Sequence, residues 1–176
     1  NGELWIAHGQ GVSVFIDNHW EIAFDGESEL FNNQVHTVAF DSLGQIWVGH
    51  INDGVSLFQN GQWIHINTDQ GQLGGDQVRD ILVQPATNLS KESVWIATLD
   101  GGITKYEQGS WHTFTVSHGL PSDHISSLAI DSYGRIWAGT DKGTAYFNGE
   151  SWILYDELAT WDIDFSPACV DNACPK

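Results

Sequence analysis

Residues 124–140 read His124-Ile-Ser-Ser-Leu-Ala-Ile-Asp-Ser-Tyr-Gly-Arg-Ile-Trp-Ala-Gly-Thr140, and this stretch recurs along the chain with small changes. Its tryptophan stands in the frame Leu/Ile/Val-Trp-Ile/Val/Ala-Ala/Gly, which occurs at Trp5, Trp47, Trp95 and Trp137. A second tryptophan follows each of these after fifteen or sixteen residues, at Trp20, Trp63, Trp111 and Trp152. Self-similarity with a period of about 40–50 residues is typical of a solenoid or a propeller. The repeat therefore indicates an architecture before it indicates any activity.

The segments within each repeat alternate apolar and polar residues over about four to eight positions, which is the period of a half-buried strand. Turn sequences that tolerate positive φ separate the segments, at Asp41-Ser-Leu-Gly44, Asn60-Gly61, Asp131-Ser-Tyr-Gly134 and Asn148-Gly149. We find no stretch with a helical stripe and caps. The pattern predicts an all-β fold made of four-stranded, up-and-down antiparallel sheets.

Each first tryptophan has a very small residue two positions later, at Ala7, Gly49, Ala97 and Gly139. Side chains alternate across a strand, so the large and the small residue share one face. This combination suits wedge-shaped packing between neighbouring sheets, as radial β architectures require. We therefore interpret the first tryptophans as packing residues rather than ligand-stacking residues. The second tryptophans are expected on the outer strands, and packing against the next sheet is favoured there too.

The stretch from Gly119-Leu-Pro-Ser-Asp to Thr140 resembles the two-component-regulator propeller repeat. That family occurs in the periplasmic sensor halves of bacterial hybrid histidine kinases and in secreted proteins. The resemblance covers nearly the whole chain, because a Gly-initiated strand follows each Trp-containing strand, at Gly11, Gly54, Gly102 and Gly143. It implies a β-propeller that serves as a scaffold for recognition, but it implies no particular ligand. Sensors of this type carry many more blades, and the chain contains no kinase segment.

The blade count follows from where the repeats begin and end in the sequence. The chain starts with Leu4-Trp5 inside a blade, and Thr160-Trp-Asp-Ile-Asp-Phe165 reads as an inner strand. We expect a four-bladed propeller in one domain, closed by pairing of this C-terminal strand with the N-terminal blade, which removes an open sheet edge. The predicted bounds are 1–24 plus 160–166 for blade 1, 34–68 for blade 2, 77–116 for blade 3 and 124–156 for blade 4. A fragment of a larger propeller and a half-ring that dimerises into eight blades are the alternatives.

The third repeat departs from the rule. The interval from Trp47 to Trp95 is 48 residues against 42 for the other two intervals, and the extra residues lie between Gln84 and Ser93. A longer polar loop there replaces the Asp-Ser-X-Gly turn. Loops on rigid scaffolds often carry function, although a tolerated surface insertion is the simpler interpretation. Within it, Asn88-Leu-Ser90 matches the glycosylation acceptor pattern, which also arises by chance.

The composition favours a protein outside the cytoplasm that binds neither nucleic acid nor anionic membranes. The 176 residues contain only six Lys and Arg, which the sequence scatters without a patch, against 23 Asp and Glu, for a net charge of −17. Binding to a phosphate backbone depends on clustered Lys and Arg, and so does binding to anionic lipid. The sequence has no hydrophobic span of membrane length, and the Asn at position 1 fits a processed or excised chain.

The two cysteines, Cys169 and Cys174, lie five positions apart near the C-terminus with Asp-Asn between them. Such spacing favours a local disulfide that stiffens the tail at residues 167–176. A metal site would need two further ligands, and a redox pair is usually spaced more tightly. A disulfide implies an oxidising compartment, which agrees with an extracellular, periplasmic or cell-surface location.

The histidines give the one hint of chemistry. His8 and His50 occupy equivalent positions where the other repeats have Thr98 and Thr140, and His36 and His124 lie at the starts of inner strands. The four are our candidate ligand-binding residues. A mixed nitrogen and oxygen metal site would combine His8 and His50 with acidic residues, and Asp-rich turns can bind Ca²⁺ through oxygen; the metal candidates are His8, His50, Asp41 and Asp131. We favour plain hydrogen-bonding roles, with each Asp in an Asx-turn and no cofactor.

The sequence contains no nucleophile elbow, phosphate loop or zinc-protease helix. The predicted function is therefore a non-catalytic extracellular or periplasmic module. It would recognise a protein, a small molecule or a glycan, or belong to a self-associating surface assembly. The alternative is a metal-dependent propeller lyase or lactonase that uses channel histidines. Fold alone does not separate these, because propellers host both kinds of function.

Overall fold

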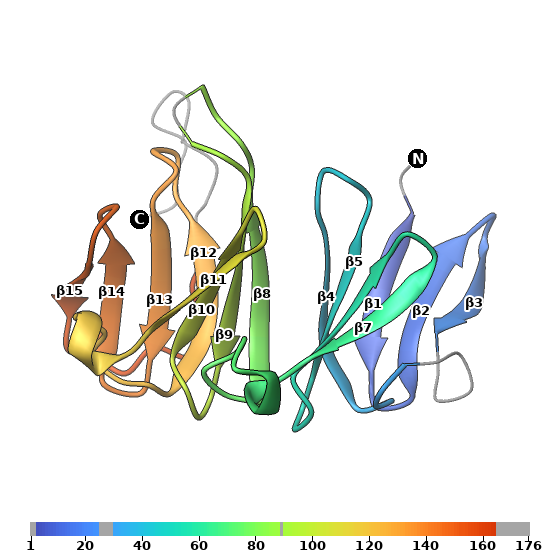
Figure 1. The fold of residues 1–176 in the computed structure, drawn as a ribbon, viewed down its shortest axis with the longest axis horizontal. Coiled ribbons are helices and arrows are strands. Elements are labelled where there is room, and N and C mark those ends of the chain that lie inside the picture. The colour runs from blue at the N-terminus through green and yellow to red at the C-terminus, as the bar shows by residue number, and fades with distance from the viewer. Residues whose placement is uncertain (1–2, 25–29, 89, 165–176) are drawn as a thin grey trace.

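A computed structural model describes residues 3–24, 30–88 and 90–164 of the chain. Its described part contains fifteen strands, and its only helices are two 3₁₀ turns, η1 (Thr68–Gln70) and η2 (Val116–His118). The strands form four antiparallel sheets whose members follow one another in sequence order (Figure 1). The prediction of an all-β, propeller-type fold is confirmed.

Each sheet is one blade. Blade 1 contains β1 (Leu4–His8), β2 (Gly11–Ile16) and β3 (His19–Phe24). Blade 2 contains β4 (Val35–Phe40), β5 (Ile46–His50), β6 (Val55–Gln59) and β7 (Gln62–Ile66). Blade 3 contains β8 (Val78–Gln84), β9 (Ser93–Thr98), β10 (Ile103–Glu107) and β11 (Ser110–Phe114). Blade 4 contains β12 (Ile125–Ile130), β13 (Ile136–Thr140), β14 (Gly143–Phe147) and β15 (Trp152–Asp156).

Short turns with positive φ join the outer strands, as the sequence predicts. Asn60 and Gly61 have φ of 52° and 76° between β6 and β7, and Gln108 and Gly109 have 50° and 84° between β10 and β11. Two consecutive positive φ values are the requirement of a type I′ turn, whose twist matches that of the flanking strands. These turns keep each blade a local meander.

The core lies between the blades rather than inside any one of them. The first tryptophans Trp47 and Trp95 are fully buried there, and each packs against the following blade. The small residue beside them is required, because a Cβ at Gly49 would come within 2.5 Å of Val78 and 2.7 Å of Thr37. The predicted pairing of a large with a small side chain is confirmed at this interface.

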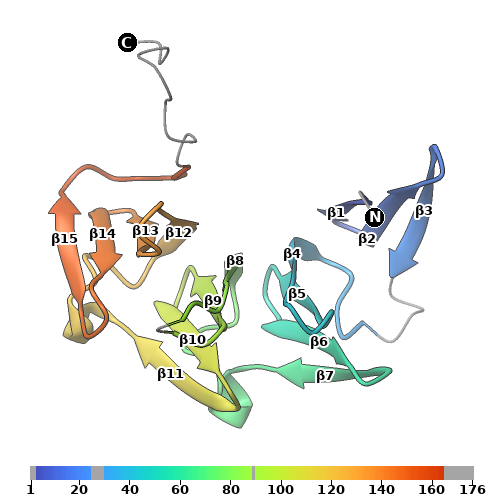
Figure 2. The ribbon, with the colours of Figure 1, turned by 90° about the horizontal axis from the view of Figure 1, so that it is seen from above.

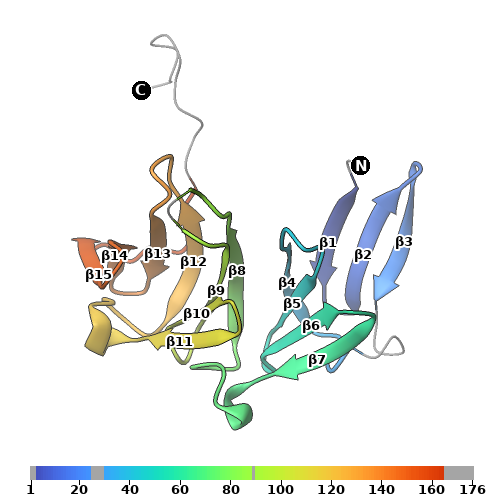
Figure 3. The ribbon, with the colours of Figure 1, turned by 45° about the horizontal axis from the view of Figure 1, so that its top comes forward.

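The four blades follow one another along an arc, and blades 1 and 4 lie at its opposite ends (Figure 2; Figure 3 gives an oblique view). The predicted closure by residues 160–166 is not seen in the described residues, where β1 pairs with β2 alone and residues 160–164 form no strand. Instead Thr160 is held by blade 4, since its backbone N–H donates to Thr140 O at 2.8 Å. The segment therefore extends the arc beyond blade 4 rather than completing blade 1.

Candidate functional site: a groove between blades 3 and 4

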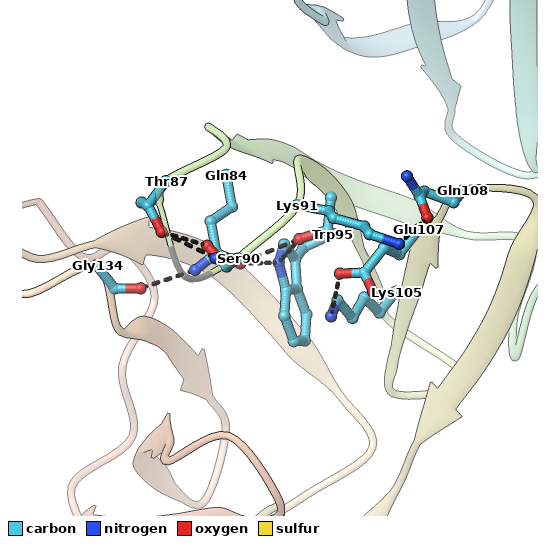
Figure 4. A network of polar contacts seen from close by, with 10 residues as sticks. Gln84, Thr87, Ser90, Lys91, Trp95, Lys105, Glu107, Gln108 and Gly134 are labelled. Carbon is cyan, nitrogen blue, oxygen red and sulfur yellow. Dashed lines mark hydrogen bonds and ion pairs between the residues drawn. The ribbon is translucent and has the colours of Figure 1, made fainter.

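The long loop between β8 and β9 folds back on itself through its own polar groups (Figure 4). The Thr87 N–H donates to Ser90 O at 2.8 Å, and the Ser90 N–H donates to Thr87 Oγ1 at 3.0 Å. The two hydroxyl oxygens lie 2.9 Å apart. Thr87 and Ser90 are thus held together on the rim of blade 3.

Gln84, the last residue of β8, ties this loop to blade 4 (Figure 4). Its Nε2 donates to Gly134 O in the β12–β13 turn at 2.8 Å. Its Oε1 accepts from Ser93 Oγ and from Trp95 Nε1, both at 3.0 Å. One amide group therefore satisfies a buried indole in its own blade and fixes the distance to the neighbouring turn.

The turn on the blade 4 side is organised by Asp131. Its carboxylate accepts hydrogen bonds from the Tyr133 and Arg135 N–H groups, from Arg135 Nε at 2.6 Å and from Trp137 Nε1 at 2.9 Å. Desolvation alone would raise the pKa of Asp131, but the bonds from Trp137, Arg135 and Tyr133 outweigh it and lower the pKa to about 2. Asp131 is thus an ionised turn-forming group at every physiological pH.

Cations lie over aromatic faces on both sides of the groove. The Arg135 guanidinium is 5.3 Å from the Tyr133 ring and 5.0 Å from the Tyr146 ring. Lys105 Nζ is 5.4 Å from the Trp95 ring and forms an ion pair with Glu107 at 2.8 Å. These distances fall in the range of cation–π attraction.

Two of the basic residues that are scattered in the sequence line this groove, one from each blade. They are Lys105 and Arg135, and Lys91 lines a neighbouring cavity that Asp41 and Leu43 of blade 2 also line. Lys91 Nζ donates to Gln108 Oε1 beside them (Figure 4). Sequence reasoning did not bring Lys105 and Arg135 together, because they belong to different blades. The one available signal was the loop itself.

The resulting groove has a volume of about 780 Å³ and a mixed lining. Its walls include Gln84, Thr87, Ser90, Lys105, Tyr133, Arg135, Tyr146 and Asn148. Ligand pockets of about 300–1,000 Å³ commonly combine aromatic surface with a few placed polar groups. The lining has no histidine, and its one carboxylate, Asp131, is already saturated with donors. The groove thus offers cations, aromatic rings and amide groups to a ligand.

The structure places His8 and His50 in equivalent local roles. His8 Nε2 lies 2.8 Å from Ser13 Oγ, and His50 Nε2 lies 2.7 Å from Ser56 Oγ. His50 is completely buried, and burial, together with the nearby His65, lowers its pKa to about 4. His50 is therefore a neutral packing residue near pH 7. At the same position in blade 4, the Thr140 hydroxyl donates to Gly143 O at 2.8 Å.

His36 and His124 lie on or beside the inner strands and are exposed. Desolvation and the neighbouring Arg79 lower the pKa of His36, which Asp80 opposes. Asp80 accepts the Leu128 N–H from the next inner strand at 2.8 Å, and burial raises its pKa. His124 Nδ1 lies 3.5 Å from Asp141. Sequence reasoning missed Asp80, because only the assembled arc brings it against blade 4.

The metal candidates do not converge. Asp41 repeats the role of Asp131, since its carboxylate accepts the Leu43 and Gln45 N–H groups and Trp47 Nε1 at 3.1 Å. Over residues 3–24, 30–88 and 90–164, no group of three or more His, Cys, Asp or Glu could hold a metal ion. Each candidate has a hydrogen-bond partner within its own blade, and metal binding by these residues stays a prediction.

Two further sequence predictions concern the loop and the tail. Asn88 is exposed in the long loop, so its side chain is accessible, and glycosylation there stays a prediction. Cys169 and Cys174 lie outside the described residues, and so does the tail that their disulfide would stiffen. Within the described ranges, no helix is long and apolar enough to cross a membrane.

The arrangement of meandering blades defines the class of the protein as a β-propeller protein. Residues 29–52 and 119–142, which include the β4–β5 and β12–β13 hairpins, match the family model described as "Two component regulator propeller". The chain therefore carries repeats of the two-component-regulator propeller family. No curated protein matches the sequence.

Solved structures support the propeller fold. The extracellular domain of the putative hybrid two component system BT3049 from B. thetaiotaomicron is 25% identical, with a TM-score of 0.75, and the match covers 89% of this chain and 22% of that one. The corresponding domain of BT4673 from the same organism is 18% identical, with a TM-score of 0.68 over 90% and 23%. PorZ, a surface component of the type-IX secretion system of Porphyromonas gingivalis, is 14% identical, with a TM-score of 0.58 over 88% and 26%. The chain spans about a quarter or less of these structures.

Proposed function

We propose that this chain is a non-catalytic recognition module that works outside the cytoplasm and binds a small anionic ligand in the groove between blades 3 and 4. The observation that carries the proposal is the built groove: Gln84 joins two blades across it, and Lys105 and Arg135 lie against aromatic rings in its walls. In a chain of net charge −17, the groove that Lys105 and Arg135 line is where an anionic group is best accommodated.

The location outside the cytoplasm rests on the relatives, two of which are described as extracellular domains and one as a bacterial surface component. Binding agrees with the chemistry of the groove. Guanidinium and ammonium groups pair with carboxylate, and the exposed ring of Tyr133 offers a flat face for a sugar or another ring. The lyase or lactonase hypothesis gains no support from the described residues, which gather no set of catalytic or metal-ligating histidines.

The test compares two probes of the same shape and different charge, a uronic-acid disaccharide and its neutral counterpart. We expect saturation-transfer NMR and tryptophan fluorescence to detect the charged probe more strongly. Tyr133→Ala and Lys105→Gln should each weaken its binding by about tenfold, which corresponds to about 1.4 kcal/mol.

Leu43→Ala is the matched control, because Leu43 holds the same turn position on blade 2 and is 80% exposed, against 84% for Tyr133. It should leave binding unchanged. Equal affinity for both probes would contradict the proposed ligand charge. An equal loss in the Leu43 variant would contradict the proposed location.

A further inference from the structure

Two of the three joints between blades share one design. On blade 3, Tyr106 and Trp111 form a cross-strand pair with ring centroids 4.6 Å apart. Trp47 of blade 2 packs onto this pair, at 5.3 Å from Tyr106 and 6.3 Å from Trp111. The joint between blades 2 and 3 therefore has a tryptophan on one blade and an aromatic pair on the next.

The joint between blades 3 and 4 repeats the design. Trp95 lies 5.2 Å from Phe147 and 6.0 Å from Trp152, which is the equivalent cross-strand pair of blade 4. Phe114, at the end of β11, adds a contact at 5.0 Å to Phe147. Side chains from both blades are buried in this joint: Trp152 is 2% exposed and Phe114 is 5% exposed.

Blade 1 carries the same aromatic pair on a face that no described blade covers. Phe15 and Trp20 lie 5.1 Å apart across β2 and β3, and Trp20 is 51% exposed. Other apolar side chains of this surface, which we call the head face, are exposed as well: Leu4, Ile6 and Ile22. The blade 3 residues equivalent to Leu4 and Ile6 are Val94 and Ile96, and both are buried.

Blade 4 carries the complementary surface at the other end of the arc. Tyr155 is equivalent to the buried Phe114, yet it is 69% exposed. It lines a cavity of about 650 Å³ together with Trp137 and Tyr146, on the side where an internal joint has its aromatic pair. We call this surface, formed by Tyr146, Tyr155 and the cavity, the tail face.

The two ends of the arc also complement each other because one has no described inner strand and the other has a segment that could form one. Blade 1 has three described strands and lacks an inner one beside β1. Thr160 lies where the first residue of a following inner strand belongs, because a Cβ at Gly139 would come within 2.9 Å of Thr160 O, just as one at Gly49 would meet Val78. The hydroxyls of Thr144 and Thr160 are 2.6 Å apart. Residues 160–164 are thus in position to supply the strand that blade 1 lacks.

Since the head and tail faces lie at opposite ends of the arc (Figure 2), one chain in this arrangement does not bring them together. We propose that the head face of one copy docks onto the tail face of a second copy, with residues 160–164 of one chain adding an inner strand beside β1 of the other. The contact would be a further example of the joint found between blades 2 and 3 and between blades 3 and 4. Head-to-tail contacts of this kind close into rings when their rotation allows it, and strand addition satisfies an open edge.

The test is the mass of the 176-residue chain by light scattering and sedimentation over about 1–200 μM, where weak self-association becomes visible. We expect dimers or larger rings. A head variant, Trp20→Ser with Ile22→Ser, and a tail variant, Tyr155→Ser, should each weaken association by about tenfold or more. Leu43→Ser removes an equally exposed apolar side chain from an unrelated turn and should have no effect.

Mixing the two variants makes the test directional. The head variant keeps an intact tail and the tail variant keeps an intact head, so a head-to-tail joint predicts that the mixture regains a 1:1 complex. Circular dichroism of each variant checks that it is folded. A monomer at every concentration would overturn the proposal, and so would association that persists in either variant alone or fails to return on mixing.

Discussion

Blades 3 and 4 hold the same buried indole in two different ways. In blade 4, Asp131 opens a short turn, caps it and accepts the Trp137 N–H. In blade 3, Gln84 and Ser93 accept the Trp95 N–H, and a long loop replaces the turn. The indole N–H must find an acceptor in both, because leaving it unsatisfied in the core costs about 1–3 kcal/mol. The acceptor itself is exchangeable.

The choice between an aspartate and a glutamine acceptor decides how long the connection between the two strands can be. An aspartate that must cap a four-residue turn fixes the length of that turn, as Asp41 does in blade 2. A glutamine at the end of β8 needs no short turn, so the chain is free to extend and to reach Gly134 on blade 4. The groove forms because the chain is longer at this point and reaches blade 4.

Removing the buried indoles of blades 3 and 4 should have the largest effect on the free energy of unfolding. Trp95→Ala and Trp137→Ala should each lower the free energy of unfolding by about 3–5 kcal/mol, because each deletes a large core side chain. Urea denaturation measures this. Trp20→Ala, on the exposed head face, is the control and should cost less than about 1 kcal/mol in the monomer. Similar losses at all three positions would mean that the repeat has been misread.

The second prediction concerns acid. The pKa of Asp131 is depressed to about 2, so its folded-state hydrogen bonds stabilise the protein above about pH 4, and this stabilisation is lost as the pH falls toward 2. Asp131→Asn should therefore cost about 1–2 kcal/mol at pH 6 and flatten the fall in stability between pH 4 and 2. Asp69→Asn, in the exposed η1, controls for the charge change. An unchanged acid slope would show that other carboxylates govern it.

Gln84→Ala tests the role of the acceptor in blade 3. It removes one acceptor of the Trp95 N–H, but Ser93 Oγ remains at 3.1 Å, so the expected cost is about 1 kcal/mol. The bond to Gly134 is lost as well, which should weaken ligand binding in the groove. Thermal melts and the binding assay measure the two effects. Gln45→Ala, whose amide donates to Gln59 within blade 2, should change neither binding nor the groove.

The smallest effect on stability is expected when the long loop of blade 3 is replaced by the short turn of blade 4. Replacing residues 84–92 by Asp-Ser-Tyr-Gly gives blade 3 the turn of blade 4, with the new aspartate accepting the Trp95 N–H. Stability should stay within about 1 kcal/mol, because the local hydrogen bonds are replaced in kind. Ligand binding should disappear, because the loop wall of the groove is gone. Retained binding would move the site away from this loop.

The sequence predicted what depends on local order. The tryptophan spacing predicted the strands and their sheets, and the Asp-Ser-X-Gly pattern predicted Asx-turns, because both follow from residues only a few positions apart. The partnership of Gln84 with Gly134 spans 50 residues and two blades, so no local pattern encodes it. The closure predicted for residues 160–166 is not seen in the described residues, where the Thr160 N–H donates to Thr140 O on blade 4; no local pattern encodes which blade this segment joins.

The meander topology makes the molecule modular along its length. Every described strand pair joins sequence neighbours, and each packing cluster forms between adjacent blades. Such near-one-dimensional assemblies owe their stability to each unit and its nearest neighbours. Gain or loss of a whole blade by duplication would therefore lengthen or shorten the arc while every remaining joint kept its geometry. The curvature of the arc would stay the same, and only the length of the surface that is available to partners would change.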